Sequence, residues 1–428
     1  MEATNNLKEL SFLVYGLGLT GRSVVSFFKR NNIKNFQVWD DQKKYIYQDK
    51  RSKNLNKSLK EVNYIILSPG VSLKKIKNKN KLKKYKNKII TDIDLIFLIK
   101  KFSKSIIITG TNGKSTTCKI LSHVLKKNKY EILLGGNIGT PILNLNIKKN
   151  SILIIEISSF QLAYSKFIIP NYAILLNITN DHLDWHGNFK NYENSKFKIF
   201  KNQKKNHYSL INNNLKNKYK SKKFCSKLIV PKITDYQKFK PKLRNSYFKS
   251  DINDENMSFV LAISKLFKIT EKSLLKSLES FNGLPHRYEI FLRVKNYTFI
   301  NDSKATSFQA TKFALKNTKN IFWIFGGLPK QKDKFDFKDF KDNIIKSYII
   351  GKKTSFFKRQ IKNKIDYKIT KNLKNSVIQI FKDLKILGKK RNSILLSPAS
   401  ASYDQFTNFE QRGDEFKRLV RNYARKHI

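Results

Sequence analysis

The chain has 428 residues, and 87 lysines and arginines against 31 aspartates and glutamates give it a formal net charge of +56. With 40% apolar residues it can form packed cores, and a chain of this length should divide into roughly two to four domains. The charge suggests nucleic acid as a partner, but the lysines are spread along the whole chain without any base-reading motif, so we expect no nucleic-acid partner.

The cysteine count and the hydropathy indicate the compartment. Cys118 and Cys225 are the only cysteines, which excludes a disulfide framework and favours a reducing compartment. No segment offers the roughly 18 consecutive apolar residues of a membrane span, and the N-terminus lacks the layout of a signal peptide. We therefore expect a cytoplasmic monomer with no stable membrane insertion.

The first predicted unit alternates apolar strands with helices, as in a parallel sheet. Its strands are expected at 10–15, 36–39 and 64–67. The first strand ends in Gly16-x-Gly18-x-x-Gly21 and is followed by a helix through Phe28, while Asp40 and Asp41 follow the second strand and Ser68-Pro-Gly70 the third. Such a glycine turn binds the diphosphate of a dinucleotide or a nucleotide sugar, so we predict a Rossmann-like nucleotide-binding domain over residues 1–92.

A phosphate loop is predicted at Gly110-Thr-Asn-Gly-Lys-Ser-Thr116, between an apolar strand at 105–109 and a helix expected over 117–127. Backbone N–H groups and the helix dipole converge on such a turn and favour a polyphosphate. Lys114 would reach the terminal phosphates, and the Ser115 or Thr116 hydroxyl would bind magnesium. Ile108 stands where the full motif has a glycine, so the loop is a compact variant; the alternative is a strand–helix turn that binds nothing.

Other polar residues of the central domain, predicted over 93–283, also follow strands. Glu156 comes directly after a strand at 151–155 and could hold magnesium, although an acid at a strand terminus can also be merely half-exposed. Asp181, His182 and Asp184 follow the strand at 172–176, and we favour a ligand role for His182 over a structural one. The polar stretch 201–223 is expected to be surface loop and short helix.

The third domain, predicted over 284–428, repeats this arrangement with strands near 298–300, 321–325, 347–350 and 393–396. Asn301-Asp-Ser-Lys-Ala-Thr306 and Ser397-Pro-Ala-Ser-Ala-Ser402 follow two of these strands. Their hydroxyls and amides could hold a small carboxylate, while Asp302 and Lys304 could alternatively pair only with each other. The predicted fold is α/β, with a Rossmann-like N-terminal domain, a central P-loop ATPase domain and a C-terminal Rossmann-like domain.

Taken in order along nearly the whole chain, these motifs resemble those of the Mur ligases of peptidoglycan synthesis. The resemblance also includes Gly135-Gly-Asn-Ile-Gly139, Glu156–Leu162, Asn180–Asp184, Gly283-Leu-Pro-His-Arg287 and 404–413. The segments 396–402 and 404–413 point to the member that adds D-glutamate. The resemblance implies that ATP phosphorylates the carboxylate of UDP-N-acetylmuramoyl-L-alanine, and that the amine of D-glutamate attacks the acyl phosphate.

The resemblance further implies the roles of the site residues. ATP would be bound by Gly110, Thr111, Asn112, Gly113, Lys114, Ser115, Thr116, Asn253, Arg287 and Asp302. Catalysis would involve Lys114, His182 and Lys196. A pair of magnesium ions would be held by Ser115, Glu156, His182 and Lys196, the lysine as a carbamate. The UDP-sugar would meet Leu17, Asp40, Asp41, Ser68, Gly70 and Asn137, and D-glutamate would meet Lys304, Thr306, Lys330, Ser402 and Phe409.

Two departures from the family pattern and three other functions bear on this interpretation. Gln42 stands where some relatives have an arginine near uridine, and Lys332 or Lys334 could replace Lys330. A Mur ligase for another amino acid is the nearest alternative. A basic ATPase would show turnover stimulated by nucleic acid and binding that weakens steeply with salt. A nicotinamide oxidoreductase, suggested by the first glycine pattern alone, would bind NADH.

Overall fold

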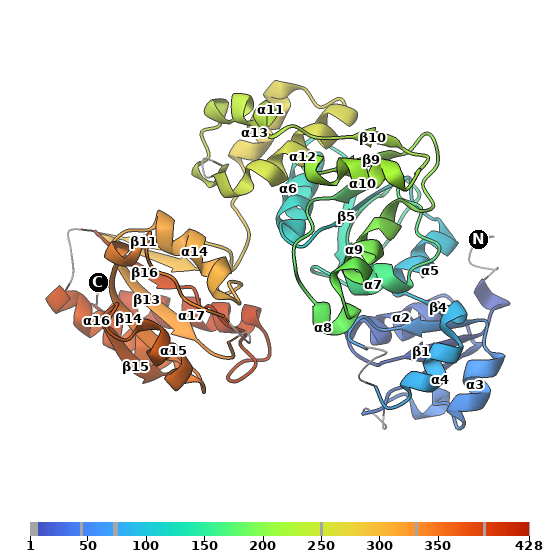
Figure 1. Cartoon of the computed structure of the whole chain (residues 1–428), viewed down its shortest axis with the longest axis horizontal. Coiled ribbons are helices and arrows are strands. Elements are labelled where there is room, and N and C mark those ends of the chain that lie inside the picture. The colour runs from blue at the N-terminus through green and yellow to red at the C-terminus, as the bar shows by residue number, and fades with distance from the viewer. Residues whose placement is uncertain are drawn as a thin grey trace. The chain divides into compact units, whose positions relative to one another are not determined.

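The structure is a computed structural model that describes residues 7–42, 46–71, 76–248, 251–329, 333–387 and 391–427, apart from the side chains of Ser246, Ile252 and His427. Its contacts divide the chain into two compact units, which we call unit 1 (Met1–Phe281) and unit 2 (Asn282–Ile428). Unit 1 runs from blue to yellow in Figure 1 and unit 2 from orange to red. Both units are α/β, which confirms the predicted fold class.

The first sheet of unit 1 is parallel, in the order β2-β1-β3-β4. Its strands are β1 (Phe12–Tyr15), β2 (Phe36–Trp39), β3 (Tyr64–Leu67) and β4 (Ile89–Ile90), with helices α2 (Leu19–Arg30), α3 (Leu55–Glu61) and α4 (Lys79–Lys84). All four residues of β1 are buried. A strand covered on both faces needs a continuous apolar run, which is why the sequence revealed it.

The second sheet of unit 1 is also parallel, in the order β10-β9-β8-β5-β7-β6. Its strands are β5 (Lys104–Thr109), β6 (Ile132–Gly136), β7 (Ile152–Glu156), β8 (Tyr172–Leu175), β9 (Tyr208–Ile211) and β10 (Lys227–Ile229). Its helices are α5 (Asp92–Ile99), α6 (Lys114–Lys127), α7 (Ser159–Tyr164), α8 (Leu183–His186), α9 (Phe189–Phe197), α10 (Lys216–Ser221), α11 (Ile233–Phe239), α12 (Asp254–Leu266) and α13 (Glu271–Glu279).

The interpretation of 201–223 as loop and short helix was wrong for four residues. Tyr208–Ile211 forms strand β9, which pairs with β8 and buries Leu210 and Ile211 completely. The strand is short and stands in polar surroundings, so it carries little apolar signal of its own. Its place in the sheet depends on the neighbouring strand.

One hydrophobic core runs through both sheets of unit 1. The same cluster contains Phe12 and Val14 of β1, Ile96 of α5, and Ile107 and Leu153 of the second sheet. The predicted domain boundary at residue 92 therefore coincides with the first residue of α5, a helix inside this shared core. The division into 1–92 and 93–283 stays a prediction.

Unit 2 contains one six-stranded sheet, in the order β11-β12-β16-β13-β14-β15, in which only the edge strand β11 is antiparallel to its neighbour. Its strands are β11 (Glu289–Val294), β12 (Tyr297–Asn301), β13 (Ile321–Gly326), β14 (Ile344–Ile350), β15 (Tyr367–Lys371) and β16 (Asn392–Leu396). Its helices are α14 (Phe308–Asn317), α15 (Thr354–Ile361), α16 (Leu373–Leu387) and α17 (Phe409–His427).

Two hydrophobic clusters form the core of unit 2. One joins Phe308 of α14 and Phe357 of α15 to Trp323 of β13, and the other joins Ile380 of α16 and Phe416 of α17 to the sheet. The helices therefore pack against the sheet in two separate hydrophobic clusters, as in a doubly wound α/β domain. The loops that carry the predicted site residues follow the carboxyl ends of the parallel strands.

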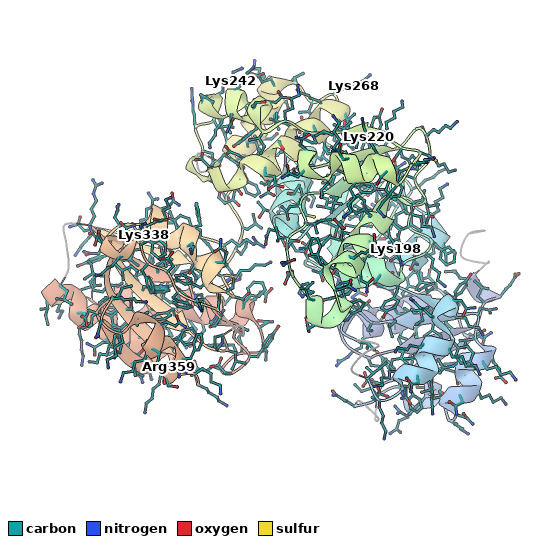
Figure 2. All side chains as sticks on the ribbon, viewed as in Figure 1. Lys198, Lys220, Lys242, Lys268, Lys338 and Arg359 are labelled. Carbon is teal, nitrogen blue, oxygen red and sulfur yellow. The ribbon has the colours of Figure 1, made fainter. Side chains whose placement is uncertain are left out.

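The basic side chains come from many elements of both units. Lys198, Lys220, Lys242 and Lys268 in unit 1, and Lys338 and Arg359 in unit 2, project from different helices and loops (Figure 2). The charge is thus distributed, as the sequence predicted. Within the described ranges, none of the helices is long and apolar enough to cross a membrane.

Candidate functional site

The phosphate loop joins β5 to α6, and its shape depends on Gly113. This glycine has φ +81°, and a Cβ at this position would lie 2.0 Å from Oδ1 of Asn256. Only glycine fits such a place. The loop is fixed from a second side, because the N–H groups of Thr111 and Asn112 donate to O and Oδ1 of Asn177, at 2.9 and 2.8 Å. Helix α6 begins at Lys114, three residues before its predicted start.

Two predicted catalytic lysines meet at one carbonyl of this loop. Lys114 Nζ donates to Gly110 O at 2.8 Å, and Lys196 Nζ, from helix α9, donates to the same oxygen at 2.7 Å. Lys114 also donates to Thr111 O at 2.7 Å, so its ammonium group lies folded over the loop. Ser115 and Thr116 follow in the first turn of α6 and are buried. The structure thus brings together side chains that are 82 residues apart in the sequence.

Lys196 is unusual because it is a buried lysine without a carboxylate partner in the described part of the chain. Only 2% of the residue is exposed, and Nζ lies 4.8 Å from the centroid of the Tyr192 ring. Burial, together with the charge of Lys114, holds the pKa of Lys196 well below its usual range. A buried amine of lowered pKa is more often neutral and is therefore a better nucleophile.

Glu156 has the properties of a metal ligand. It stands at the carboxyl end of β7, directly beside β5, and is 2% exposed. Its Oε1 accepts from Nδ2 of Asn137 at 3.1 Å, whereas its Oε2 is buried and has no hydrogen-bond partner among the described residues. A buried carboxylate oxygen without a donor is costly, and a divalent cation would satisfy it. The residues present therefore fit magnesium at this position.

The remaining metal candidate, His182, lies at the rim of the same site. Its ring is about half exposed, packs 4.8 Å from the Phe160 ring centroid, and places Nε2 3.4 Å from Oδ2 of Asp181. The described residues contain no group of three or more histidines, cysteines, aspartates and glutamates that could hold a metal ion alone. Hydroxyl groups, phosphate oxygens or water would have to complete the coordination.

The first glycine turn is tightly packed. Gly16 has φ +94°, its carbonyl accepts from Ser68 Oγ at 2.6 Å, and a Cβ on Gly21 would lie 1.9 Å from that carbonyl oxygen. Leu17 donates its N–H to Asp40 Oδ2 at 2.6 Å, but its side chain is completely buried. The exposed apolar side chain of the turn is instead Leu19, at 82% exposure. Sequence reasoning missed it, although an apolar first residue of a helix was a signal.

Asp41 is fixed by three donors. It accepts from Tyr15 Oη at 2.9 Å, Trp39 Nε1 at 3.0 Å and Asn78 Nδ2 at 2.9 Å. The guanidinium of Arg51 lies 5.0 Å from the Trp39 ring centroid. The site thus has an arginine near its second strand although position 42 is a glutamine. Gly70 lies in the turn after β3, with open space around it.

The adenine candidate Asn253 is not the asparagine that contacts the phosphate loop. Asn253 is buried and donates to Tyr247 O at 3.4 Å. Asn256, one helical turn later, faces Gly113 and accepts from Thr117 Oγ1 at 3.4 Å. Sequence reasoning missed Asn256, for which the spacing within helix α12 was the only available signal.

In unit 2, Asp302 lies at the carboxyl end of β12 and is held by two donors. Its Oδ2 accepts from Ser397 Oγ at 2.6 Å and its Oδ1 from the Tyr288 N–H at 3.1 Å. Burial raises the pKa of Asp302 to about 7, although Ser397, Tyr288 and the charge of Arg287 oppose the shift. The carboxyl group therefore titrates near neutral pH.

Three of the D-glutamate candidates, Lys304, Thr306 and Ser402, follow two adjacent strand ends, since β12 pairs with β16 up to Asn301 and Leu396. Lys304 Nζ lies 4.8 Å from the Phe409 ring centroid, Ser402 is 3% exposed, and Thr306 is half-buried. Lys330 lies outside the described residues, as does Lys332.

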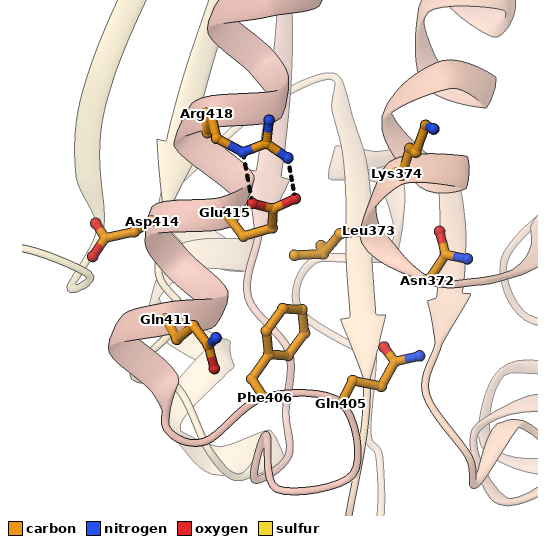
Figure 3. A pocket seen from close by; sticks show the side chains of 9 residues that line it. All are labelled: Asn372, Leu373, Lys374, Gln405, Phe406, Gln411, Asp414, Glu415 and Arg418. Carbon is orange, nitrogen blue, oxygen red and sulfur yellow. Dashed lines mark hydrogen bonds and ion pairs between the residues drawn. The ribbon is translucent and has the colours of Figure 1, made fainter.

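A separate pocket of about 560 Å³ in unit 2 contains none of the predicted site residues. Figure 3 shows that its lining comes from the start of α16, from α17 and from the loop before α17, and that Arg418 forms two hydrogen bonds with Glu415. The lining residues are Asn372, Leu373, Lys374, Gln405, Phe406, Gln411, Asp414, Glu415 and Arg418. These side chains include both charges, and nothing in their arrangement selects a ligand.

Two family models match the chain. The Mur ligase middle domain matches residues 108–275, and the Mur ligase MurD-like N-terminal domain matches residues 10–90. Together they cover the phosphate loop, Glu156, His182 and Lys196, and the first glycine turn with its acids.

Curated relatives match nearly the whole length. Proteins named UDP-N-acetylmuramoylalanine--D-glutamate ligase from Rickettsia felis and Buchnera aphidicola are 34% and 36% identical, covering 96% and 95% of this chain and 97% of each relative. The protein of that name from the Wolbachia of Brugia malayi is 32% identical over 96% of both chains.

Solved structures share the fold at lower identity. The ligase MurF from Thermotoga maritima, solved in complex with ADP, has a TM-score of 0.58 at 18% identity and covers 99% of this chain and 97% of its own. The ligase MurC from the same organism has a TM-score of 0.57 at 16% identity, covering 98% and 100%.

Proposed function

The chain belongs to the Mur ligase family, and we propose that it joins D-glutamate to UDP-N-acetylmuramoyl-L-alanine, releasing ADP and phosphate. It is an ATP-dependent ligase of peptidoglycan precursor synthesis. One observation in the structure carries the assignment of its reaction centre. Lys114 and Lys196 converge on Gly110 O of a phosphate loop, in the same domain as a buried carboxylate oxygen of Glu156 that has no hydrogen-bond partner among the described residues.

The reaction proceeds in two steps. The carboxylate oxygen of the alanyl group forms a bond to the γ-phosphorus of ATP, the bond from that phosphorus to the β-bridging oxygen breaks, and ADP leaves. The amine nitrogen of D-glutamate then attacks the acyl carbon, the carbon–oxygen bond to phosphate breaks, and the nitrogen loses a proton. Both steps depend mainly on positioning and charge neutralisation, which Lys114 would supply to the transferring phosphoryl group.

We assign the magnesium ligands to Ser115, Glu156, His182 and a carbamate on Lys196. Bound magnesium would neutralise the phosphate oxygens and orient them for in-line transfer. The orphaned Oε2 of Glu156 supports its assignment. A carbamate forms when the neutral Nζ of Lys196 attacks carbon dioxide and loses a proton. It would turn the buried side-chain nitrogen of Lys196 into the anion that a metal ion requires.

The first sheet would bind the UDP-sugar. The Gly16–Gly21 turn, Ser68, Gly70 and Asn137 would face its phosphates, with Asp40 and Asp41 at the uridine. Leu17 would contribute only its backbone, because its side chain is buried, and exposed Leu19 is the apolar side chain available at this rim. Asn253, Arg287 and Asp302 would meet the nucleotide of ATP.

The strand ends of unit 2 would bind the amino acid. Lys304, Thr306, Lys330, Ser402 and Phe409 are assigned to D-glutamate, whose two carboxylates need cationic and hydroxyl partners. We further propose that the enzyme is a monomer and that it works in the cytoplasm, where both nucleotide substrates are available.

The test is phosphate release by the purified protein with ATP, magnesium and UDP-N-acetylmuramoyl-L-alanine, in the presence and absence of D-glutamate. We expect release that requires D-glutamate and is not supported by L-glutamate, L-lysine or meso-diaminopimelate. Release supported by one of those amino acids would assign a different Mur ligase activity. Release that ignores D-glutamate but rises with added nucleic acid would replace the proposal with the basic ATPase.

A further inference from the structure

Arg412 is a buried cation in unit 2 to which neither the sequence motifs nor the proposed reaction gives a role. It belongs to the first turn of α17, and only 1% of the residue is exposed. Burial lowers its pKa to about 10, so it remains charged at neutral pH. A buried charge is costly unless its hydrogen bonds are made, which raises the question of what this guanidinium holds.

The partners of Arg412 are backbone and hydroxyl oxygens of two strand-end loops. Nε donates to Ser303 Oγ at 3.0 Å, while Nη2 donates to Ser303 O at 2.8 Å and to Ser400 O at 3.1 Å. Ser303 follows β12 and Ser400 follows β16, and both are completely buried. A planar guanidinium has its donors in a fixed fork, so it sets the distance between the two loops.

The contacts continue to the start of helix α17. Ser303 Oγ, which accepts from Arg412, donates in turn to Phe409 O at 2.8 Å. Arg412 thereby joins three segments, and each carries a residue assigned to D-glutamate. Lys304 is next to Ser303, Ser402 is two residues after Ser400, and the carbonyl of Phe409 accepts from Ser303 Oγ. The remaining nitrogen, Nη1, is buried and has no partner in the described part of the chain.

We propose that Arg412 is a positioning residue that fixes Lys304, Ser402 and Phe409 at the spacing that D-glutamate requires. The inference rests on the proposed function, since it concerns the amino-acid site of that ligase. Arg412 acts on this site through other residues. Its loss should therefore reduce the rate of D-glutamate ligation far more than it reduces the rate of the preceding step, in which the nucleotide-sugar carboxylate is phosphorylated.

The first test compares Arg412→Lys with Arg418→Ala. Lysine keeps the charge but cannot reach three oxygens with a planar fork. Arg418 lies on the same helix, is 60% exposed and pairs with Glu415 (Figure 3). A displacement of about 1 Å can cost on the order of 100-fold in rate, so we expect kcat/KM for D-glutamate to fall by roughly 30- to 100-fold in Arg412→Lys, mainly through KM. Arg418→Ala should match the wild type.

A partial reaction separates positioning from general damage. Hydroxylamine attacks an acyl phosphate to give a hydroxamate and phosphate, and it needs no amino-acid site. We expect Arg412→Lys to form hydroxamate from ATP and UDP-N-acetylmuramoyl-L-alanine within about twofold of the wild-type rate. The phosphate loop lies in unit 1, and Arg412 donates to Ser303 and Ser400 rather than to Arg287 or Asp302, the residues of unit 2 assigned to ATP. Equal loss of hydroxamate and of D-glutamate ligation would overturn the proposal, as would an unchanged KM for D-glutamate.

Ser303→Ala provides the second variant, which is needed if Arg412→Lys does not fold. It removes one hydroxyl group and thus the link between Nε of Arg412 and Phe409 O. We expect KM for D-glutamate to rise about tenfold, with a melting temperature lowered by only a few degrees because Nε of Arg412 loses its acceptor. An unchanged KM would contradict the inference. A wild-type enzyme that forms hydroxamate but does not use D-glutamate would refute the proposed function instead.

Discussion

At the scale of single residues, the phosphate loop shows how the protein holds a site for negative charge. The side-chain nitrogens of Lys114 and Lys196 both donate to Gly110 O, so two basic groups share one acceptor. Two positive charges at one acceptor repel each other, and this repulsion adds to the effect of burial in lowering the pKa of Lys196. A polyphosphate bound at the loop would offer Lys114 better acceptors than a carbonyl.

Lys114→Ala should therefore abolish turnover without weakening the binding of the nucleotide sugar. We expect phosphate release to fall by at least about 100-fold, because the lost charge acts on the transferring phosphoryl group. Binding of UDP-N-acetylmuramoyl-L-alanine, measured by calorimetry, should stay within about twofold, since its assigned residues lie mainly on the first sheet.

The matched control is Lys126→Ala, an exposed lysine in the last turn of the same helix. It should leave both measurements unchanged. Normal turnover in Lys114→Ala would refute the assignment of the phosphate loop.

Asp302 supplies a prediction of pH dependence. Burial raises its pKa in the folded protein from about 4 to about 7, so between these values the folded state binds one proton more than the unfolded state. Stability should therefore fall as the pH rises through this window and level off above it. The loss amounts to at most about 4 kcal/mol, at roughly 1.4 kcal/mol for each unit of pKa.

Asp302→Asn removes the titrating group and keeps its shape. We expect its melting temperature to depend less on pH between 5 and 8 than that of the wild type, in calorimetric scans without ligands. Asp342→Asn, at an exposed position of the same unit, controls for the change in net charge. Parallel pH profiles for wild type and Asp302→Asn would show that Asp302 does not titrate in this range.

Some site residues could be predicted from the sequence because their signal is local. Lys114 follows two glycines of a loop, and Glu156 ends an apolar strand. Arg412 and Asn256 could not be found this way, because their partners are distant in the sequence: Arg412 contacts Ser303, and Asn256 contacts Gly113. Leu17 and Leu19 are an intermediate case: both are leucines of one glycine turn, and only the place of Leu19 at the start of a helix indicated that it is the exposed one.

At the scale of elements, the first glycine turn depends on one close approach. A Cβ on Gly21 would lie 1.9 Å from Gly16 O, a backbone atom that cannot move away cheaply, whereas a Cβ on Gly18 would meet nothing within 4 Å. The two glycines of one motif therefore have different reasons to be glycine. Gly21 permits the helix to pack on the strand, and Gly18 leaves room for a ligand.

Gly21→Ala should consequently destabilise unit 1, and Gly18→Ala should not. Overpacking of this kind typically costs about 1–3 kcal/mol, while Gly18→Ala should stay within roughly 0.5 kcal/mol of the wild type. The measurement is the shift in the denaturant midpoint of each variant. Equal midpoints for the two variants would mean that the helix and strand can separate at this turn without cost.

Elements were predictable where a short run of apolar and aromatic residues stands out from its surroundings. The predicted strands at 36–39 and 64–67 coincide with β2 and β3. Strand β3 is a continuous run of aromatic and apolar residues, whereas β2 contains the exposed Gln37 between Phe36 and Val38. Strand β9 escaped prediction because it is short and lies in a lysine- and asparagine-rich stretch. The start of α6 was placed too late because Lys114–Thr116 carries no apolar periodicity, although the helix already begins after Gly113.

At the scale of the whole molecule, the cores explain the division into units. The two sheets of unit 1 share one cluster, which includes Phe12 and Ile107, whereas the clusters of unit 2 contain residues of that unit only. Cooperative unfolding follows contiguous cores. The sequence predicted three domains, but it could not show that the first two share a core, because that depends on side chains packed between distant segments.

Two calorimetric transitions are therefore expected for the ligand-free protein, one for each unit. Leu395→Ala empties a completely buried position in the sheet of unit 2 and should cost about 2–5 kcal/mol. It should lower the midpoint of one transition and leave the other in place, while Gly21→Ala should shift the transition that Leu395→Ala leaves unchanged. If both substitutions instead displace a single transition together, the units unfold as one cooperative body, and separate cores do not determine how this chain unfolds.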